Sequence, residues 1–307
     1  MRSHTRREWM AFALAPAAEP RALMRVPFQA PGEPALKPEE VKITLNGKAA
    51  RVVRLLAPGS DLFLLLVLDL SGDLTLVDPA RQALLKRLAA LPGNVRVALM
   101  RAQDGLRPAL DPGAPRAALT AAIESLATSP RPGLLDSLEN AQMLADSIAA
   151  RAHVRVAALF ISDSNVLNYQ EDYSNPVVNS SDSGDMSRRF PEGLINEKIR
   201  QIKARMRHGE SPLYLVHLQY LSDRLNTAYQ TGLQELLRSS GGSAEYCRSL
   251  ADIPNSVDRA CDAILQAQYT AEVEMAPGKN GTVDLVVIAE GRTIHSRPRR
   301  QFSEKGR

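Results

Sequence analysis

Along most of this chain, hydrophobic and polar residues form two patterns, one typical of buried strands and one typical of helices. The apolar run from Leu62 to Leu68 has no polar alternation, which is typical of a central strand covered by helices on both faces. The other predicted strands and helices alternate along the chain: strands at 95–101, 154–161 and 212–218, and helices at about 78–90, 114–127, 133–150, 192–208 and 223–240. This order predicts an α/β fold with a doubly wound, mostly parallel sheet.

Shorter strands are predicted at both ends of the α/β part. Asn46-Gly47 separates the segments 41–45 and 50–56, and this dipeptide readily forms the tight turn of a β-hairpin. Three further strands are predicted near the C-terminus, at 269–275, 282–289 and 292–297. We expect them to form a small β extension that pairs with the N-terminal hairpin.

The predicted elements divide the chain into four parts. Gly241-Gly242 ends the last long helix, and a strand and a helix then close the α/β part, at 243–247 and 253–268. The parts are an export-signal-like segment with a Pro-rich linker, a β-hairpin, the α/β domain, and a β extension with a basic tail: 1–35, 36–60, 61–268 and 269–307.

The N-terminal segment resembles a twin-arginine export signal. Arg6-Arg7 precedes a short apolar stretch, Met10 to Leu14, and then Ala15-Pro16-Ala17-Ala18. Residues 19–38 hold five prolines and little periodic pattern, which indicates an extended linker. We therefore expect a periplasmic or extracellular protein. The alternative is a cytoplasmic protein with an ordinary basic start and a short helix.

Charge and composition argue against two classes of protein. The net charge is +4, from 38 basic and 34 acidic residues, and the basic ones are scattered apart from the cluster at Arg297 to Arg300. With only 5% aromatic residues, the chain lacks the basic face and stacking surface of a nucleic-acid-binding protein. No apolar run approaches the roughly 18–20 residues of a transmembrane helix.

Cys247 and Cys261 are the only cysteines, and no Cys/His pattern typical of a zinc site surrounds them. In an exported protein they could form one disulfide, and two buried free thiols are the alternative.

The segment from Ser164 to Met186 is rich in Asn, Ser and Asp and has neither a helical nor a strand period. It is predicted to be a long loop that directly follows a central strand. Loops of this length in compact domains are usually functional or disordered. Its tyrosines, Tyr169 and Tyr173, would suit contacts with a partner.

Two strands of the predicted sheet end in aspartate. The first continues as Asp69-Leu70-Ser71-Gly72-Asp73, and the later one as Ser162-Asp163-Ser164. Ligands of open parallel sheets gather at the carboxyl ends of the strands, and Mg²⁺ prefers oxygen ligands. Asp69, Ser71, Asp73 and Asp163 are therefore the candidate metal ligands. The alternative is that these side chains only cap turns and the following helix.

The first of these segments resembles the Asp-x-Ser-x-Ser motif of von Willebrand factor type A (VWA) domains, with Asp69 and Ser71 matching and Asp73 in place of the final serine. The strand that ends at Asp163 is similar to the later VWA segment, which ends in Thr-Asp-Gly. This resemblance implies a Rossmann-like VWA sheet and a metal-ion-dependent adhesion site for Mg²⁺ or Mn²⁺. It also implies that a carboxylate of a protein partner completes the shell of the ion.

The site departs from the family at one position. Pro132 stands where the family has a threonine ligand, and proline offers neither a side-chain oxygen nor an N–H. Asp73 would compensate in part, because a carboxylate is a stronger magnesium ligand than a hydroxyl. The site is thus a degenerate one.

Beyond these motifs the chain resembles the VWFA-related domain family known mainly from acidobacteria, over residues 36 to 303. The resemblance rests on the hairpin around Asn46-Gly47-Lys48, on Ser240-Gly241-Gly242 and the helix that ends at Tyr269, and on Gly291-Arg292-Thr293. It implies a binding protein and not an enzyme.

Enzymatic alternatives lack the residues they need. Ser71 has no neighbouring base, the five histidines show no metal-ligand spacing, and no Gly-rich phosphate loop follows the first strand. His217 lies in an apolar strand and is interpreted as a core residue. A hydrolase that uses Asp69, Asp73 and Asp163 around a metal is the remaining enzymatic alternative.

We therefore expect an exported VWA-domain protein that binds an unidentified protein partner through the metal site. The alternative is a metal-independent scaffold that binds through its β extension or exposed edge strands.

Overall fold

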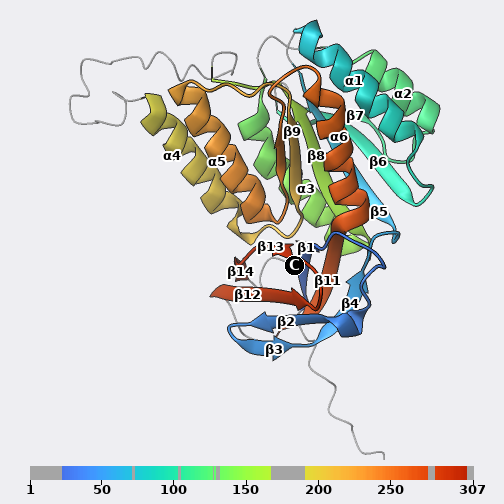
Figure 1. Ribbon diagram of the computed structural model, residues 1–307, viewed down its shortest axis with the longest axis vertical. Helices are drawn as coiled ribbons and strands as arrows, with labels where there is room; N and C mark the ends of the chain where they lie inside the picture. Colours follow the sequence, from blue (N-terminus) through green and yellow to red (C-terminus); the bar gives the residue numbers. More distant parts are fainter. Residues whose placement is uncertain are drawn as a thin grey trace, which may run out of the picture.

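The computed structural model describes residues 23–70, 73–102, 105–126, 128, 132–166, 191–275 and 281–302. A six-stranded sheet forms its centre (Figure 1). Its strands are β5 (Leu62–Asp69), β6 (Val95–Arg101), β7 (Arg107–Leu110), β8 (Arg155–Ser162), β9 (Leu213–His217) and β10 (Ala244–Tyr246). The spatial order is β10-β9-β8-β5-β6-β7, and only β7 is antiparallel to its neighbour. The predicted mostly parallel α/β sheet is thus confirmed.

Helices cover both faces of this sheet: α1 (Leu74–Ala89), α2 (Arg116–Glu124), α3 (Leu134–Arg151), α4 (Pro191–Arg205), α5 (Arg224–Ser240) and α6 (Asp252–Asp262). Two separate cores result, because alternate residues of β5 point to opposite faces. Leu64 and Leu66 pack with α1, α2 and α6, whereas Leu65 and Val67 pack with α3, α4 and α5. Both faces of β5 are therefore buried, which explains why its apolar run is continuous.

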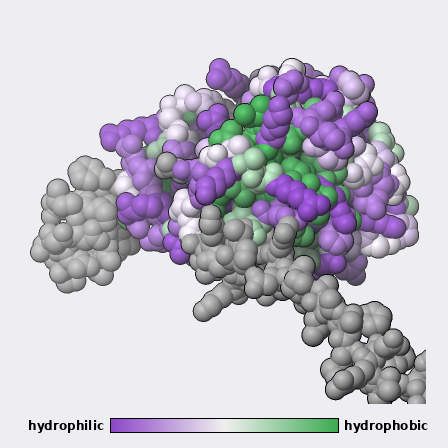
Figure 2. Space-filling view, turned by 90° about the horizontal axis from the view of Figure 1, so that it is seen from below, coloured by the Kyte–Doolittle hydropathy of each residue, from purple (hydrophilic) through white to green (hydrophobic). Residues whose placement is uncertain are grey.

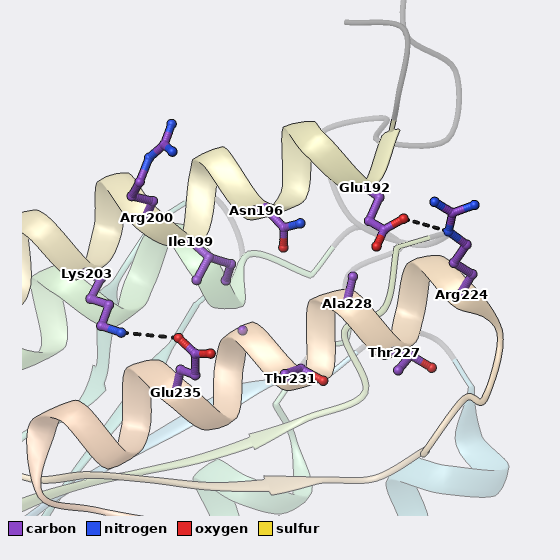
Figure 3. A pocket seen from close by; sticks show the side chains of 11 residues that line it. Glu192, Asn196, Ile199, Arg200, Lys203, Arg224, Thr227, Ala228, Thr231 and Glu235 are labelled. Atoms are coloured by element: carbon purple, nitrogen blue, oxygen red, sulfur yellow. Dashed lines mark hydrogen bonds and ion pairs between the residues drawn. The ribbon is translucent and has the colours of Figure 1, made fainter. Parts of the chain in front are cut away.

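Helices α4 and α5 lie side by side (Figure 3) and form the left edge of the molecule in Figure 1. Gly232 lets the two backbones approach, because a Cβ there would lie 2.7 Å from Ile199 Cγ1. Ion pairs join the helices at both ends of the contact: Glu192 with Arg224 and Lys203 with Glu235. Both pairs are partly exposed to water, so each stabilises the contact by at most about 1 kcal/mol.

Two helix boundaries differ from the predictions. Helix α1 begins at Leu74 and not near 78, because the Asp73 side chain accepts a hydrogen bond from the Thr75 N–H and caps the helix four residues earlier. The last helix ends at Asp262 instead of 268. A π-helical turn, Ala263–Ala267, follows it and leads directly into a strand.

Below the α/β part lie two four-stranded sheets (Figure 1). Their strands are β1 (Leu23–Gln29), β2 (Val41–Leu45), β3 (Lys48–Ala50), β4 (Val52–Leu56), β11 (Gln268–Glu274), β12 (Gly281–Ala289), β13 (His295–Ser296) and β14 (Arg299–Phe302). One sheet has the order β13-β1-β11-β4 and the other β14-β12-β2-β3. Between them they bury a third core that includes Met24, Phe28, Ile43, Tyr269 and Val287.

The prediction of an extended linker over residues 19–38 is wrong for strand β1. Its apolar residues Met24, Val26 and Phe28 alternate along the strand and are fully buried against β11. The prolines hid this pattern, although Pro27 fits a strand whose pairing with β13 is limited to Phe28 and Gln29.

The predicted hairpin and β extension do pair with each other. The turn between β2 and β3 has positive φ angles at Asn46 and Gly47, as expected for this dipeptide. Strand β12 runs antiparallel to β2, with Val287 opposite Ile43. Two details differ: β4 leaves the hairpin to join β11, and the predicted strand 292–297 shrinks to the two residues of β13, with β14 after it.

Buried arginines join the β sheets to the α/β part. The Arg25 guanidinium on β1 donates hydrogen bonds to the carbonyls of Ala149, Ala152 and Val154, at the end of α3 and just beyond it. Arg155 donates to the carbonyls of Ser60, Ile264 and Gln268. These hydrogen bonds connect residues of the β sheets with residues of the α/β part, so they stabilise the way the two parts meet.

Cys247 and Cys261 are both buried and free. None of the helices within the described residues has both the length and the apolar character to cross a bilayer.

Candidate functional site

Asp69 and Asp163 stand together at the carboxyl edge of the central sheet. β5 and β8 are parallel neighbours, and Asp69 pairs in register with Ser162, the residue before Asp163. Both aspartates are buried, with 0% and 1% of their surface exposed. The sequence placed these two residues at one sheet edge, and the structure does bring them together.

Each carboxylate oxygen of Asp69 accepts a hydrogen bond from an uncharged group. The Gly133 N–H, at the N-cap of α3, donates to Oδ1 at 2.7 Å, and the Ser162 hydroxyl donates to Oδ2 at 2.8 Å. Pro132 comes just before Gly133 and is buried. The segment that lacks the expected threonine oxygen therefore contributes a backbone donor from the next residue.

Burial raises the pKa of the Asp69 carboxyl from 3.8 to about 7. The two hydrogen bonds favour the charged form and lower the pKa, and the nearby charge of Asp163 raises it. Removal from water is the largest of these effects. Near neutral pH, Asp69 thus exchanges between its neutral and charged forms.

Asp73 has a different place from Asp69. Its exposed side chain caps α1, with Oδ1 accepting from the Thr75 N–H at 3.0 Å and the Thr75 hydroxyl at 2.6 Å. Ser71 lies outside the described residues. Within the parts of the chain that the structure describes, no three His, Cys, Asp or Glu side chains form a group that could hold a metal ion.

Behind the two aspartates lies a buried polar network. The Ser164 N–H donates to the Ser162 hydroxyl at 3.0 Å, and the Ser164 and Tyr229 hydroxyls are 2.7 Å apart. His217 Nε2 lies 2.6 Å from the Ser164 carbonyl, to which it donates. Burial lowers the pKa of the His217 imidazole to about 4, so it is neutral at pH 7. This agrees with the interpretation of His217 as a core residue.

Sequence reasoning missed most of this network. Its signal was present in the polar triplet Ser162-Asp163-Ser164, which follows the apolar run from Val156 to Ile161. Asn226 at the start of α5 was also missed, and its side-chain carbonyl accepts the Val166 N–H at 2.9 Å. These bonds anchor the first residues of the predicted loop 164–186, whose residues from 167 onward lie outside the described part.

The raised pKa of Asp69 has a measurable consequence for stability. The unfolded chain loses this proton near pH 4 and the folded protein near pH 7, so the folded state binds more protons in between and the free energy of unfolding falls as pH rises from about 4 to 7. An Asp69→Asn variant keeps the shape of the side chain but has no carboxyl group to titrate, so its free energy of unfolding lacks this fall. We expect it to exceed the unmodified protein by on the order of 3 kcal/mol at pH 8 and to match it at pH 4.

Urea denaturation with EDTA at both pH values measures this difference. Equal stabilities of the two proteins at pH 8 would show that Asp69 titrates normally.

The chain thus combines a doubly wound sheet with acidic side chains at the carboxyl edge of that sheet. No protein-family model and no curated protein matches the sequence. Similar solved structures include a von Willebrand factor type A protein from Catenulispora acidiphila, at 12% identity and a TM-score of 0.46 over 92% of this chain and 72% of that one. Von Willebrand factor type A proteins are thus among the structural neighbours of this chain.

Two other neighbours are proteins of pili and byssus. The PilB minor pilin from Streptococcus sanguinis is 13% identical, with a TM-score of 0.46 over 67% of this chain and 62% of that one. Proximal thread matrix protein 1 from the mussel byssus, with a zinc-occupied MIDAS motif, is 13% identical, with a TM-score of 0.40 over 72% of this chain and 48% of that one. The chain spans less than two thirds of either protein. At sequence identities this low, the similarity indicates a shared fold and nothing about function.

Proposed function

We propose that this chain is an exported, non-enzymatic VWA-type protein that binds a protein partner at the carboxyl edge of its central sheet. The observation that carries this proposal is the buried pair of Asp69 and Asp163 on adjacent parallel strands. Removing carboxylates from water is costly unless positive charge compensates them, and the Gly133 N–H and the Ser162 hydroxyl, which donate to Asp69, are both neutral. A bound cation would supply this charge.

The residues at this edge fit such a cation. The two oxygens of Asp69 offer about four lone-pair sites, of which the hydrogen bonds from Gly133 and Ser162 use two, and the Leu134 N–H also interacts with this carboxylate. Asp69, Ser71, Asp73 and Asp163 would hold Mg²⁺ or Mn²⁺, with Asp73 turning away from Thr75. The ion would supply an open coordination position for a carboxylate of the partner. Pro132 contributes no ligand, so water fills its position.

Calorimetric titration of the full chain with Mg²⁺ and Mn²⁺ tests the metal site. We expect a binding heat that the Asp69→Ala substitution abolishes, because it removes the central ligand. Asp61→Ala is the matched control, since Asp61 is an exposed aspartate just before the opposite end of the same strand. Asp69→Asn shows whether a loss of binding stems from the missing charge or from the missing hydrogen bonds.

If the unmodified protein gives neither heat nor a metal-dependent rise in melting temperature, the metal site does not exist. A second candidate function, that of a metal-independent scaffold, then holds. One observation favours it: the Gly133 N–H at the N-terminus of α3 already donates to Asp69, and the positive end of a helix can stabilise a carboxylate without a metal.

Export is a separate part of the proposal and rests on Arg6-Arg7 before the apolar stretch. Replacing both arginines with lysine should keep the protein in the cytoplasm of a bacterium with a twin-arginine pathway. Cell fractionation measures this. Export of the double-lysine variant at the unmodified level would refute the assignment of a twin-arginine signal.

A further inference from the structure

Within the described residues, one face of the sheet formed by β14, β12, β2 and β3 is uncovered. Side chains of β12 alternate between buried and exposed, so Val286 and Ile288 point outward with 49% and 51% of their surface exposed. Their cross-strand neighbours on β2 are Thr44 and Lys42, and Ala49 of β3 continues the row beyond Thr44. Seen from below, hydrophobic residues gather in the middle of the molecule and hydrophilic ones border them (Figure 2).

A groove of about 440 Å³ opens beside this face. Ile288 lines the groove as well as the exposed face, and the buried side chain of Leu36 lines it too. Ile288 therefore joins the two features into one surface. We call the groove together with Val286 and Ile288 the Ile288 surface.

The wall of the groove is held in place by Arg292. Its guanidinium donates to the carbonyls of Pro31 and Pro34. Gly32 lies between them with φ of +115°, and a Cβ there would come within 1.9 Å of the guanidinium. The positive φ angle favours glycine at this position, and the two hydrogen bonds of Arg292 hold the loop that forms the wall.

The charge of the groove is opposite to that of the whole chain. Four glutamates line it against one lysine and one arginine: Glu33, Glu39, Glu40, Glu290, Lys42 and Arg292. Lys42 already pairs with Glu290, at 3.2 Å from Nζ to Oε1. Glu33 and Glu39 are exposed and take part in no ion pair within the described residues. An acidic groove therefore lies next to an apolar face in a chain of net charge +4.

We propose that the Ile288 surface binds a segment of a partner protein in which basic residues stand next to aliphatic ones. The aliphatic residues would cover Val286 and Ile288, and the basic residues would meet Glu33 and Glu39. An apolar face beside unpaired carboxylates favours a segment of this kind. The carboxylates would repel the phosphates of nucleic acid and of anionic lipid. This site lies at the opposite end of the molecule from the sheet edge with Asp69, so either proposal can fail without the other (Figure 1).

The first test uses the full chain and two fluorescent peptides. One has three lysines followed by three valines, and the other has three glutamates in place of the lysines. Fluorescence anisotropy should show at least about tenfold tighter binding of the lysine peptide, and this preference should shrink as salt rises and screens the charges. Equal affinity for the two peptides would overturn the proposal.

Variants then assign the binding to this surface. Replacing Glu33 and Glu39 with glutamine should weaken binding of the lysine peptide about fivefold, and Ile288→Ser should weaken it about threefold. The matched control replaces Glu192 and Glu235, the glutamates of the contact between α4 and α5, with glutamine (Figure 3). All altered side chains lie at the surface, so circular dichroism should show an unchanged fold. Unchanged affinity in both test variants, or an equal loss in the control, would overturn the proposal.

Discussion

The Gly242→Ala variant should lose at least about 3 kcal/mol of its free energy of unfolding or fail to fold. A Cβ on Gly242 would lie 1.8 Å from the carbonyl oxygen of Leu213 and 2.6 Å from its carbonyl carbon. Both are backbone atoms at the start of β9, in the middle of the fold. The Ser240 hydroxyl also accepts the Leu213 N–H at 2.9 Å, so this backbone cannot shift without breaking further contacts.

Gly93→Ala is the matched control, because a Cβ at Gly93 meets no atom within 4 Å. We expect its stability to stay within about 0.5 kcal/mol of that of the unmodified protein. Urea denaturation followed by circular dichroism measures both variants. If Gly242→Ala were as stable as Gly93→Ala, the close packing of this turn against β9 would be wrong.

Loss of Arg25 should be nearly as damaging. In Arg25→Ala, three carbonyl groups at the end of α3 lose their donor, and Glu272, 3.7 Å away and almost fully buried, loses a positive partner. Leaving a buried charge and buried carbonyls unpaired typically costs about 3–5 kcal/mol. The melting temperature should fall accordingly, and the β sheets should become accessible to protease before the α/β part.

The comparison variant is Arg200→Ala, which removes an arginine whose side chain is 77% exposed on α4. It should change stability by less than about 1 kcal/mol. If Arg25→Ala also changed stability by less than about 1 kcal/mol, water would replace the guanidinium at little cost. Another contact would then hold the two parts together.

The central fold could be predicted because its pattern is repetitive. A run such as Leu62 to Leu68 has one physical explanation, burial on both faces, and alternating helices and strands allow few arrangements. Strand β1 could not be predicted in this way. Its burial depends on β11, far along the chain, and Pro27 interrupts a pattern only five residues long. The burial of Arg25 could not be predicted either, because its partners are carbonyl groups that no sequence pattern marks.

The candidate site was predicted only in part, for a similar reason. Asp69 and Asp163 follow apolar strands, so topology alone brings them to one edge. The cap formed by Asp73 was weighed only as an alternative, because the same carboxylate serves a helix or a metal equally well. The backbone donor at Gly133 is visible only in three dimensions, since every residue carries such a group.

The pairing of β1 with β11 also bears on how the protein is made. Leu23 lies opposite Glu274, so β1 stays without this neighbour until β11, far along the chain, has also left the ribosome. The α/β part can meanwhile collapse from contacts nearer in sequence, and the third core closes last. During that interval the alternating apolar residues of β1 form an unpaired edge. A chaperone or a second nascent chain would meet this strand first.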